Sequence, residues 1–353
     1  MEYREKIGQL IHTHPLHIET DVYVGGRPPS SASSEFLTNK EQGDWAEKLV
    51  LEAINSGSSD YVAFSYGKSD SISAGDPGFA EFYRSYQDEL NSIGKRPDIL
   101  IYRKNNAPSS IDCLKEKRWI SNAIAAIEVR SSSFLANRYR SSMEERTLHA
   151  EARCEELRNR IMAFPYGDML KVKNPSVYSL LQNATVRTYR ELGFRAVSWS
   201  STKELRELSE LLKELKSNIS ILHKRDHLSI TPKLEDIALV NRWINVYNVP
   251  HYYLQVFFDR AYMISFEDIL SISSDVEKDG SVFSVEGDVK NQGKTTIKID
   301  IDAGAPVIQR IDMPQHRSAM KELERGRLLF YVKFEGGRGY MDFDVFNKVL
   351  ENA

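Results

Sequence analysis

Two short segments of the chain place charged residues on apolar strands, where they could do chemistry. Residues 125–133, which read AAIEVRSSS, alternate so that Glu128 and Arg130 point to the same face of an expected strand. A carboxylate and a guanidinium are costly to bury there unless they are paired or bind a ligand. Residues 96–102, RPDILIY, predict a second apolar strand with Asp98 at its start. Asp98 and Glu128 could therefore converge on one bound cation.

The chemistry that this pair could support is metal-dependent hydrolysis of a phosphodiester bond. Mg²⁺ prefers oxygen ligands and retains several waters, so Asp98, Glu128 and the backbone carbonyl of Val129 would suffice to bind it. The ion would neutralise phosphate oxygens and lower the pKa of the attacking water. Arg130 could position that water, although arginine cannot act as a general base. Lys233 is a second candidate for this cation, after Arg130, if the strand before it lies beside the Glu128 strand.

The order Pro-Asp…Glu-x-Arg resembles the Pro-Asp…(Asp/Glu)-x-Lys signature, PD-(D/E)xK, of a large group of metal-dependent nucleases. Arg130 departs from its last position. The same residues also allow a structural interpretation, in which Asp98 begins a strand and Glu128 pairs with Arg130. The burial argument, the order of the segments and the helix that precedes them favour the nuclease.

That preceding helix is expected to begin at Thr38, with Glu41 completing a capping box. Glu47 lies at the margin of its apolar stripe, and Gly43, four residues earlier, would let another backbone approach. Glu47 is either a solvated glutamate or an extra acid of the site, which the first core helix often supplies in this nuclease group. We favour the second interpretation.

Composition limits the class of protein. The 353 residues, 41% hydrophobic and 27% charged, suit one large or two medium globular domains. No apolar run approaches the roughly 20 residues that span a bilayer, and no secretory signal opens the chain. Cys113 and Cys154 cannot form a disulfide framework and fit a reducing cytoplasm. The formal net charge of −3 argues against a purely electrostatic DNA binder, but not against a DNA enzyme with a local basic cleft.

Changes in pattern divide the chain into four regions. Residues 1–135 form an N-terminal part and the first half of an α/β core. Residues 136–226, rich in Arg and Glu, form a helical insertion whose arginines could meet phosphates, although the interleaved acids favour a plain exposed helix. Residues 227–272 complete the core, and residues 273–353 are β-rich.

The second half of the core is expected to contain a parallel crossover. A strand at 228–231 leads to a helix capped by Thr231 with Pro232 in its first turn. An apolar and therefore central strand follows at 251–258.

Three further features allow two interpretations each. Helix 203–223 carries Leu205, Leu208, Leu212, Leu215, Ile219 and Leu222, the seam of a short coiled coil. This seam either packs within its own domain or forms a dimer contact. Arg27, in a Gly/Pro/Ser-rich loop, lies in a flexible connection or touches a phosphate of a bound ligand. His12, His14 and His17 indicate an ordinary turn rather than a metal site, because Pro15 interrupts them.

Longer segments resemble the AccI-type restriction endonucleases. These are RPDILIY (96–102), AIEVRSSSFL (126–135), LSITPKLED (228–236), NVPHYYLQVFFD (248–259) and LLFYVKFE (328–335). The resemblance covers most of the chain. It implies an α/β PD-(D/E)xK restriction-endonuclease-like mixed sheet flanked by helices, with a helical insertion and a β-rich C-terminal part. It also implies that Asp98 and Glu128 bind Mg²⁺ and that Arg130 stands where lysine is usual.

The function expected from this resemblance is that of a type II restriction endonuclease. Such an enzyme works as a homodimer, cuts both strands of a short double-stranded DNA site, and is paired with a cognate DNA methyltransferase. Two alternatives remain open at this point: a structure-selective or repair nuclease of the same fold, and a catalytically inactive DNA-binding relative.

Overall fold

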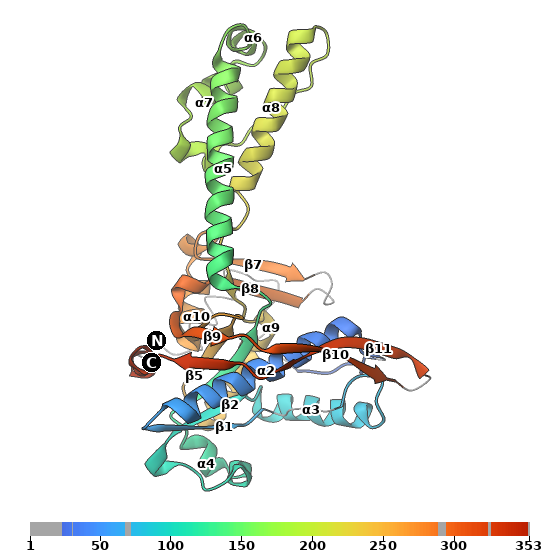
Figure 1. The fold of residues 1–353 in the computed structure, drawn as a ribbon, viewed down its shortest axis with the longest axis vertical. Helices are drawn as coiled ribbons and strands as arrows, with labels where there is room; N and C mark the ends of the chain where they lie inside the picture. Colours follow the sequence, from blue (N-terminus) through green and yellow to red (C-terminus); the bar gives the residue numbers. More distant parts are fainter. Residues whose placement is uncertain (1–22, 30, 68–71, 289–293, 324–325, 352–353) are drawn as a thin grey trace. The chain divides into compact units, whose positions relative to one another are not determined.

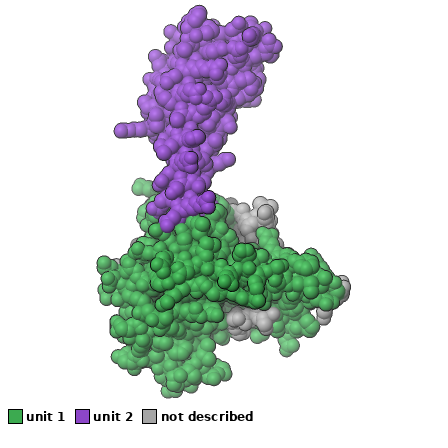
Figure 2. Space-filling view, viewed as in Figure 1, with its two compact units in different colours: residues 1–136, 229–353 green, residues 137–228 purple. Residues whose placement is uncertain are grey.

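The computed structural model describes residues 23–351 except 30, 68–71, 289–293 and 324–325. His12, His14 and His17 lie outside the described residues. The chain divides into two compact units, residues 1–136 with 229–353 and residues 137–228 (Figure 2). Among the helices of the described residues, we find none with the length and apolar character that crossing a membrane requires.

The larger unit is a mixed α/β fold around a seven-stranded sheet (Figure 1). Its strands lie in the order β1 (Tyr61–Ser65), β2 (Ile99–Arg103), β3 (Ala125–Ser131), β5 (His251–Val256), β6 (Ala261–Ser265), β9 (Ala305–Asp312) and β12 (Arg338–Met341). Only β3 and β5 pair in parallel, and every other neighbouring pair in this sheet is antiparallel.

Helices cover both faces of this sheet because the side chains of its central strands alternate. Tyr252 and Leu254 of β5 join the main core, to which α2 and α11 contribute. His251 points to the opposite face, where its ring contacts Trp243 of α9 and Phe266 of α10. The helices of this unit are α2 (Ser34–Gly57), α3 (Phe79–Ile93), α4 (Lys117–Ser121), α9 (Leu234–Tyr247), α10 (Phe266–Ser273) and α11 (Phe343–Glu351).

Two smaller sheets complete the larger unit. One joins β4 (Ser229–Ile230), β8 (Lys294–Asp300) and β7 (Phe283–Asp288), and the other pairs β10 (Gln315–Glu322) with β11 (Leu328–Glu335). The C-terminal residues are rich in strands, as expected. However, β9 and β12 belong to the main sheet, and α11 follows them.

The smaller unit is helical and has its own core. It contains α5 (Ala136–Met162), α6 (Tyr166–Lys173), α7 (Pro175–Asn183) and α8 (Lys203–Leu222). The six apolar residues of the α8 seam are all buried, none more than 5% exposed, and they pack with residues of α5 and α7. The interpretation of this seam as a dimer contact is therefore wrong, because its own unit already covers it.

Two predicted helix starts are also wrong. Helix α2 begins a turn before Thr38, because the Ser33 hydroxyl accepts a hydrogen bond from the Phe36 N–H and caps the helix there. Thr38 instead accepts a hydrogen bond from the Val332 N–H of β11. Helix α9 is preceded by Lys233 rather than by Thr231, so Pro232 lies outside its first turn.

The predicted parallel crossover from strand 228–231 to strand 251–258 is not formed. Strand β4 pairs antiparallel with β8, outside the main sheet. The strand parallel to β5 is β3, so the crossover connection comprises the helical unit, β4 and α9. The prediction of a fully buried, central strand at His251 is confirmed by β5.

Candidate active site

The two segments singled out in the sequence lie side by side. Strands β2 and β3 pair antiparallel from Ile99 and Ile127 onward. Asp98 stands just before this ladder, and its backbone N–H donates to the Ile127 carbonyl. On β3, Glu128 is 3% exposed and lies level with Tyr253 of β5. The sheet thus brings Asp98 and Glu128 to one end of the β2–β3 pair.

Glu128 and Arg130 belong to a closed group of four buried or half-buried charges, here called the charge cluster: Lys95, Glu128, Arg130 and Asp236. Lys95 Nζ lies 2.6 Å from Glu128 Oε1 and 2.7 Å from Asp236 Oδ2. Arg130 Nη2 lies 3.0 Å from the same two oxygens. Each acid therefore contacts both cations, and the four formal charges cancel.

Mutual pairing keeps all four groups of the charge cluster ionised. Burial alone would raise the pKa of Glu128 and Asp236, but the charges of Lys95 and Arg130 outweigh it and hold both below their usual values. Burial alone would lower the pKa of Lys95 and Arg130, but the two acids raise both. Neither cation can act as a general base near neutral pH.

Asp98 lies next to the charge cluster. Among the described residues, no cation forms an ion pair with it. Burial raises its pKa well above the usual range, and repulsion from Glu128 and Glu47 adds to the shift. Its Oδ2 accepts a hydrogen bond of 2.7 Å from the Val129 N–H, which opposes the shift only in part. The hydrogen bond from β3 thus holds the Asp98 side chain in place, while burial and the neighbouring acids disfavour its ionised form.

Glu47, on α2, is electrostatically part of the same site. Its pKa is raised to about 7 by burial, then by Asp44 and Glu128, with Lys40 and Arg130 acting in the opposite direction. Glu47 is half-buried, and its charge interacts unfavourably with those of Glu128 and Asp98. Gly43 plays no role in close packing, because a Cβ added there would meet nothing within 4 Å.

Lys95 was missed by the sequence analysis, and Gly94 explains its position. Gly94 has a φ of 82°, and a Cβ on it would lie 2.1 Å from the Leu239 carbonyl oxygen of α9. Glycine thus allows the chain to touch α9, where the Lys95 N–H donates to the same carbonyl. This contact brings Lys95 beside Asp236 in the first turn of α9. The sequence did contain one indication of this role. Lys95 lies three residues before Asp98, and Arg130 stands where the motif usually has its final lysine.

The structure does not meet the condition under which Lys233 would supply the positive charge of the site. Strand β4 lies beside β8, so the condition that the preceding strand adjoin β3 is not met. Lys233 forms an isolated bridge with Thr296 of β8, and its charge helps to lower the pKa of Asp236. Asp236, in the first turn of α9, accepts hydrogen bonds from two cations of the charge cluster, Lys95 and Arg130.

The donor set fits a divalent cation on two carboxylates and a carbonyl. Glu128 Oε2 is buried and has no hydrogen-bond partner among the described residues, and Asp98 is repelled by its acidic neighbours. In a strand, the N–H and carbonyl of one residue point to the same side, so the Val129 carbonyl also faces Asp98. Within the described part of the chain, no group of three or more His, Cys, Asp or Glu side chains is arranged to hold a metal.

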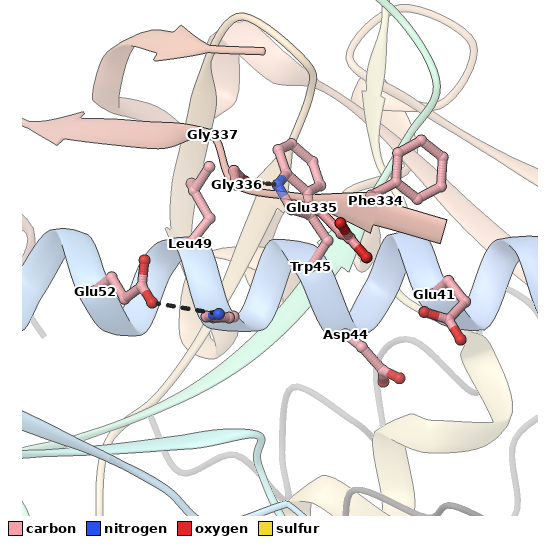
Figure 3. A pocket seen from close by; sticks show the side chains of 10 residues that line it. Glu41, Asp44, Trp45, Leu49, Glu52, Phe334, Glu335, Gly336 and Gly337 are labelled. Atoms are coloured by element: carbon pink, nitrogen blue, oxygen red, sulfur yellow. Dashed lines mark hydrogen bonds and ion pairs between the residues drawn. The ribbon is translucent and has the colours of Figure 1, made fainter. Parts of the chain in front are cut away.

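A separate hollow lies on another side of α2, between this helix and the turn that joins β11 and β12 (Figure 3). Four acids line it, Glu41, Asp44, Glu52 and Glu335, together with Lys48. The Trp45 indole N–H donates to the Gly336 carbonyl and closes one wall. Residues two apart on a helix point about 200° apart, so Trp45 faces this hollow while Glu47 faces the candidate site.

The sequence as a whole matches one family model. The model is described as AccI restriction endonuclease, and the match covers residues 1–352. No curated protein and no solved structure matches the chain. Because the family model covers essentially the whole chain, the protein belongs to the AccI restriction endonuclease family.

Proposed function

We propose that the protein is a type II restriction endonuclease that uses Mg²⁺ to hydrolyse phosphodiester bonds at a specific sequence in double-stranded DNA. Its family supports a nuclease acting on DNA. The observation that carries the site assignment is the group of three acids beside Lys95 and Arg130, in which Glu128 is buried and Glu47 and Asp98 are half-buried. As in the PD-(D/E)xK group, we propose a homodimer that works in the cytoplasm alongside a cognate DNA methyltransferase.

The charge balance of the site supports one divalent ion. The charge cluster is neutral, so Asp98 and Glu47, when ionised, leave a surplus of two negative charges. We propose that Asp98, Glu128 and the Val129 carbonyl hold Mg²⁺, which would neutralise phosphate oxygens and lower the pKa of the attacking water. Burial and the neighbouring acids raise the pKa of Glu47 to about 7, so Glu47 could hold or release a proton beside Glu128 and Asp98 near neutral pH.

Two cations share the role that the motif gives to one lysine. Arg130 contacts Glu128 directly, and Lys95 contacts the same oxygen. Both stay protonated, so they act as fixed positive charges that orient Glu128 and stabilise charge on the phosphate in the transition state. Lys95 thus takes over from Lys233 as the second candidate for the cation that the motif lacks.

The test is digestion of sequenced, unmethylated DNA by the pure protein with Mg²⁺, followed by mapping of the ends. Discrete fragments with ends at one short sequence are expected, and methylation of that sequence should protect it. Nicks confined to branches or lesions would instead identify a structure-selective nuclease. Binding without cutting, in Mg²⁺ and in Mn²⁺, would identify an inactive relative.

A further inference from the structure

Charge is distributed unevenly between the two units. Residues 137–228 contain 17 Lys and Arg against 12 Asp and Glu, a net charge of +5. The rest of the chain contains 30 against 38, a net charge of −8, which together give the overall −3. A polyanion such as DNA is repelled by the acidic unit and attracted by the helical one.

One side of α5 carries part of the positive charge of the helical unit. Arg138, Arg146, His149, Arg153 and Arg160 are separated by eight, three, four and seven residues, which places them along one stripe. Glu145 and Glu156 share this stripe, and Arg153 is paired with Glu156 and with Glu214 of α8. Among the described residues, no acid forms an ion pair with Arg138, Arg146 or His149.

The stripe meets further basic residues where the chain leaves α8. Arg146 Nη2 lies 3.3 Å from the Lys224 carbonyl oxygen and 3.2 Å from that of Arg225, and it donates to both. Arg146 Nε is buried without a hydrogen-bond partner. A surface hollow between α5 and α8 is lined by Arg146, His149 and Arg153, together with one acid, Glu145. Three cationic residues, Arg146, Lys224 and Arg225, thus come together in one part of the helical unit, where they would attract a bound anion.

We propose that this basic surface, formed by Arg138, Arg146, His149, Lys224 and Arg225, binds the phosphate backbone of DNA. The proposal rests on the nuclease function and adds a division of labour to it. The acidic unit carries the hydrolytic site, and the helical unit supplies most of the electrostatic attraction for the substrate. Phosphate contacts of this kind hold a protein on DNA without reading its sequence.

The test compares two variants of the full chain that each lose three exposed cations. The first carries Arg138→Gln, Lys224→Gln and Arg225→Gln in the basic surface. The matched control carries Lys115→Gln, Lys117→Gln and Arg118→Gln in the nuclease unit, where all three are exposed. Affinity for a short DNA duplex is measured without Mg²⁺ at several salt concentrations, so that no cutting occurs.

The first variant is expected to bind about 10- to 100-fold more weakly than wild type, and the slope of log affinity against log salt should fall by about 2 to 3. The control should bind like wild type. Equal binding by both variants, or weaker binding by the control, would overturn the proposal.

A second measurement uses the wild-type protein, so that a folding defect in the variants cannot affect its result. Bound DNA should protect Lys224 from acetylation and leave Lys115 reactive, and the opposite pattern would contradict the proposal. The proposal for the basic surface and the proposed nuclease function can fail independently in these experiments. A protein that binds through this surface but never cuts would refute the nuclease alone, and one that cuts but binds elsewhere would refute the basic surface alone.

Discussion

At the scale of single residues, the site combines a neutral group of charges with two acids that have no cation of their own. The charge cluster can remain buried because each of its acids contacts both cations. Asp98 and Glu47 are instead raised in pKa by burial and by neighbouring acids. Changes in the charge cluster should therefore lower stability, whereas changes at Asp98 and Glu47 should lower activity without destabilising the fold.

Asp98→Asn is expected to abolish cutting without destabilising the fold. The asparagine oxygen can still accept the Val129 N–H, and a neutral side chain removes the repulsion from Glu128 and Glu47. Loss of the Mg²⁺ ligand that we propose Asp98 to be should slow cleavage about a hundredfold or more. Glu128→Gln, the contrasting variant, should lower the free energy of unfolding by about 3–5 kcal/mol, because it leaves Lys95 and Arg130 with one acid.

Urea unfolding and plasmid cleavage on the same samples test both expectations. An Asp98→Asn protein that cuts at the wild-type rate would remove Asp98 from the metal site. One that unfolds as easily as Glu128→Gln would show that the Asp98 charge stabilises the fold.

His251 should make the fold sensitive to acid. The side chain is 1% exposed, neither ring nitrogen has a hydrogen-bond partner, and burial lowers its pKa to about 4, with Lys95 and Arg130 opposing the effect of Glu128. In the unfolded chain the pKa is about 6.5, so the unfolded state binds the proton first. The contribution is fully present above pH 6.5, and about 3 kcal/mol is lost as the pH falls to 4.

Urea unfolding at pH 7, 6 and 5 checks this, because His251→Phe should flatten the decline relative to wild type. His316→Phe, at an exposed position, should keep the wild-type decline. If all three proteins lose stability in parallel, His251 is not the responsible group.

At the scale of elements, the predictions succeeded where a pattern is local. Strands β2, β3 and β5 are found where apolar runs predicted them, because burial of such runs leaves few alternatives. Strand β4 was misplaced because two residues can pair with any free edge, and its partner β8 lies about 65 residues further on. Lys95 was missed because its position depends on the contact between Gly94 and α9, which no local pattern encodes.

Gly94→Ala tests that contact. A Cβ at position 94 would lie 2.1 Å from the Leu239 carbonyl oxygen and 2.7 Å from the backbone nitrogen of Trp243. The positive φ of Gly94 would add strain of about 1–2 kcal/mol for any other residue. We expect a loss of more than about 2 kcal/mol in unfolding free energy and slower cleavage, because Lys95 moves away from Glu128 and Asp236. Gly43→Ala in α2, where added atoms meet nothing, should instead stabilise by up to about 1 kcal/mol.

Thermal unfolding and cleavage rates of the two variants measure this difference. If Gly94→Ala proves as stable and active as wild type, the glycine is not what positions Lys95.

At the scale of the whole molecule, the main hydrophobic cores of the two units share no residue. The main core draws on α2, α11 and the large sheet, and the second on the helices between residues 150 and 222. The seam of α8 illustrates the limit of sequence patterns here. Its spacing fits a helix partner in the same unit as well as one in another chain, and only the fold decides between them.

Separate cores predict separate losses of stability. Leu215, fully buried in the helical unit, and Leu254, fully buried in the sheet, are matched positions for replacement by alanine. Each change should cost about 2–5 kcal/mol locally. Hydrogen exchange should show that Leu215→Ala loses protection in residues 137–228 and keeps it in β3 and β5, while Leu254→Ala shows the reverse. If either variant loses protection in both units together, the two units unfold as one, and the helical unit cannot vary its stability independently of the hydrolytic site.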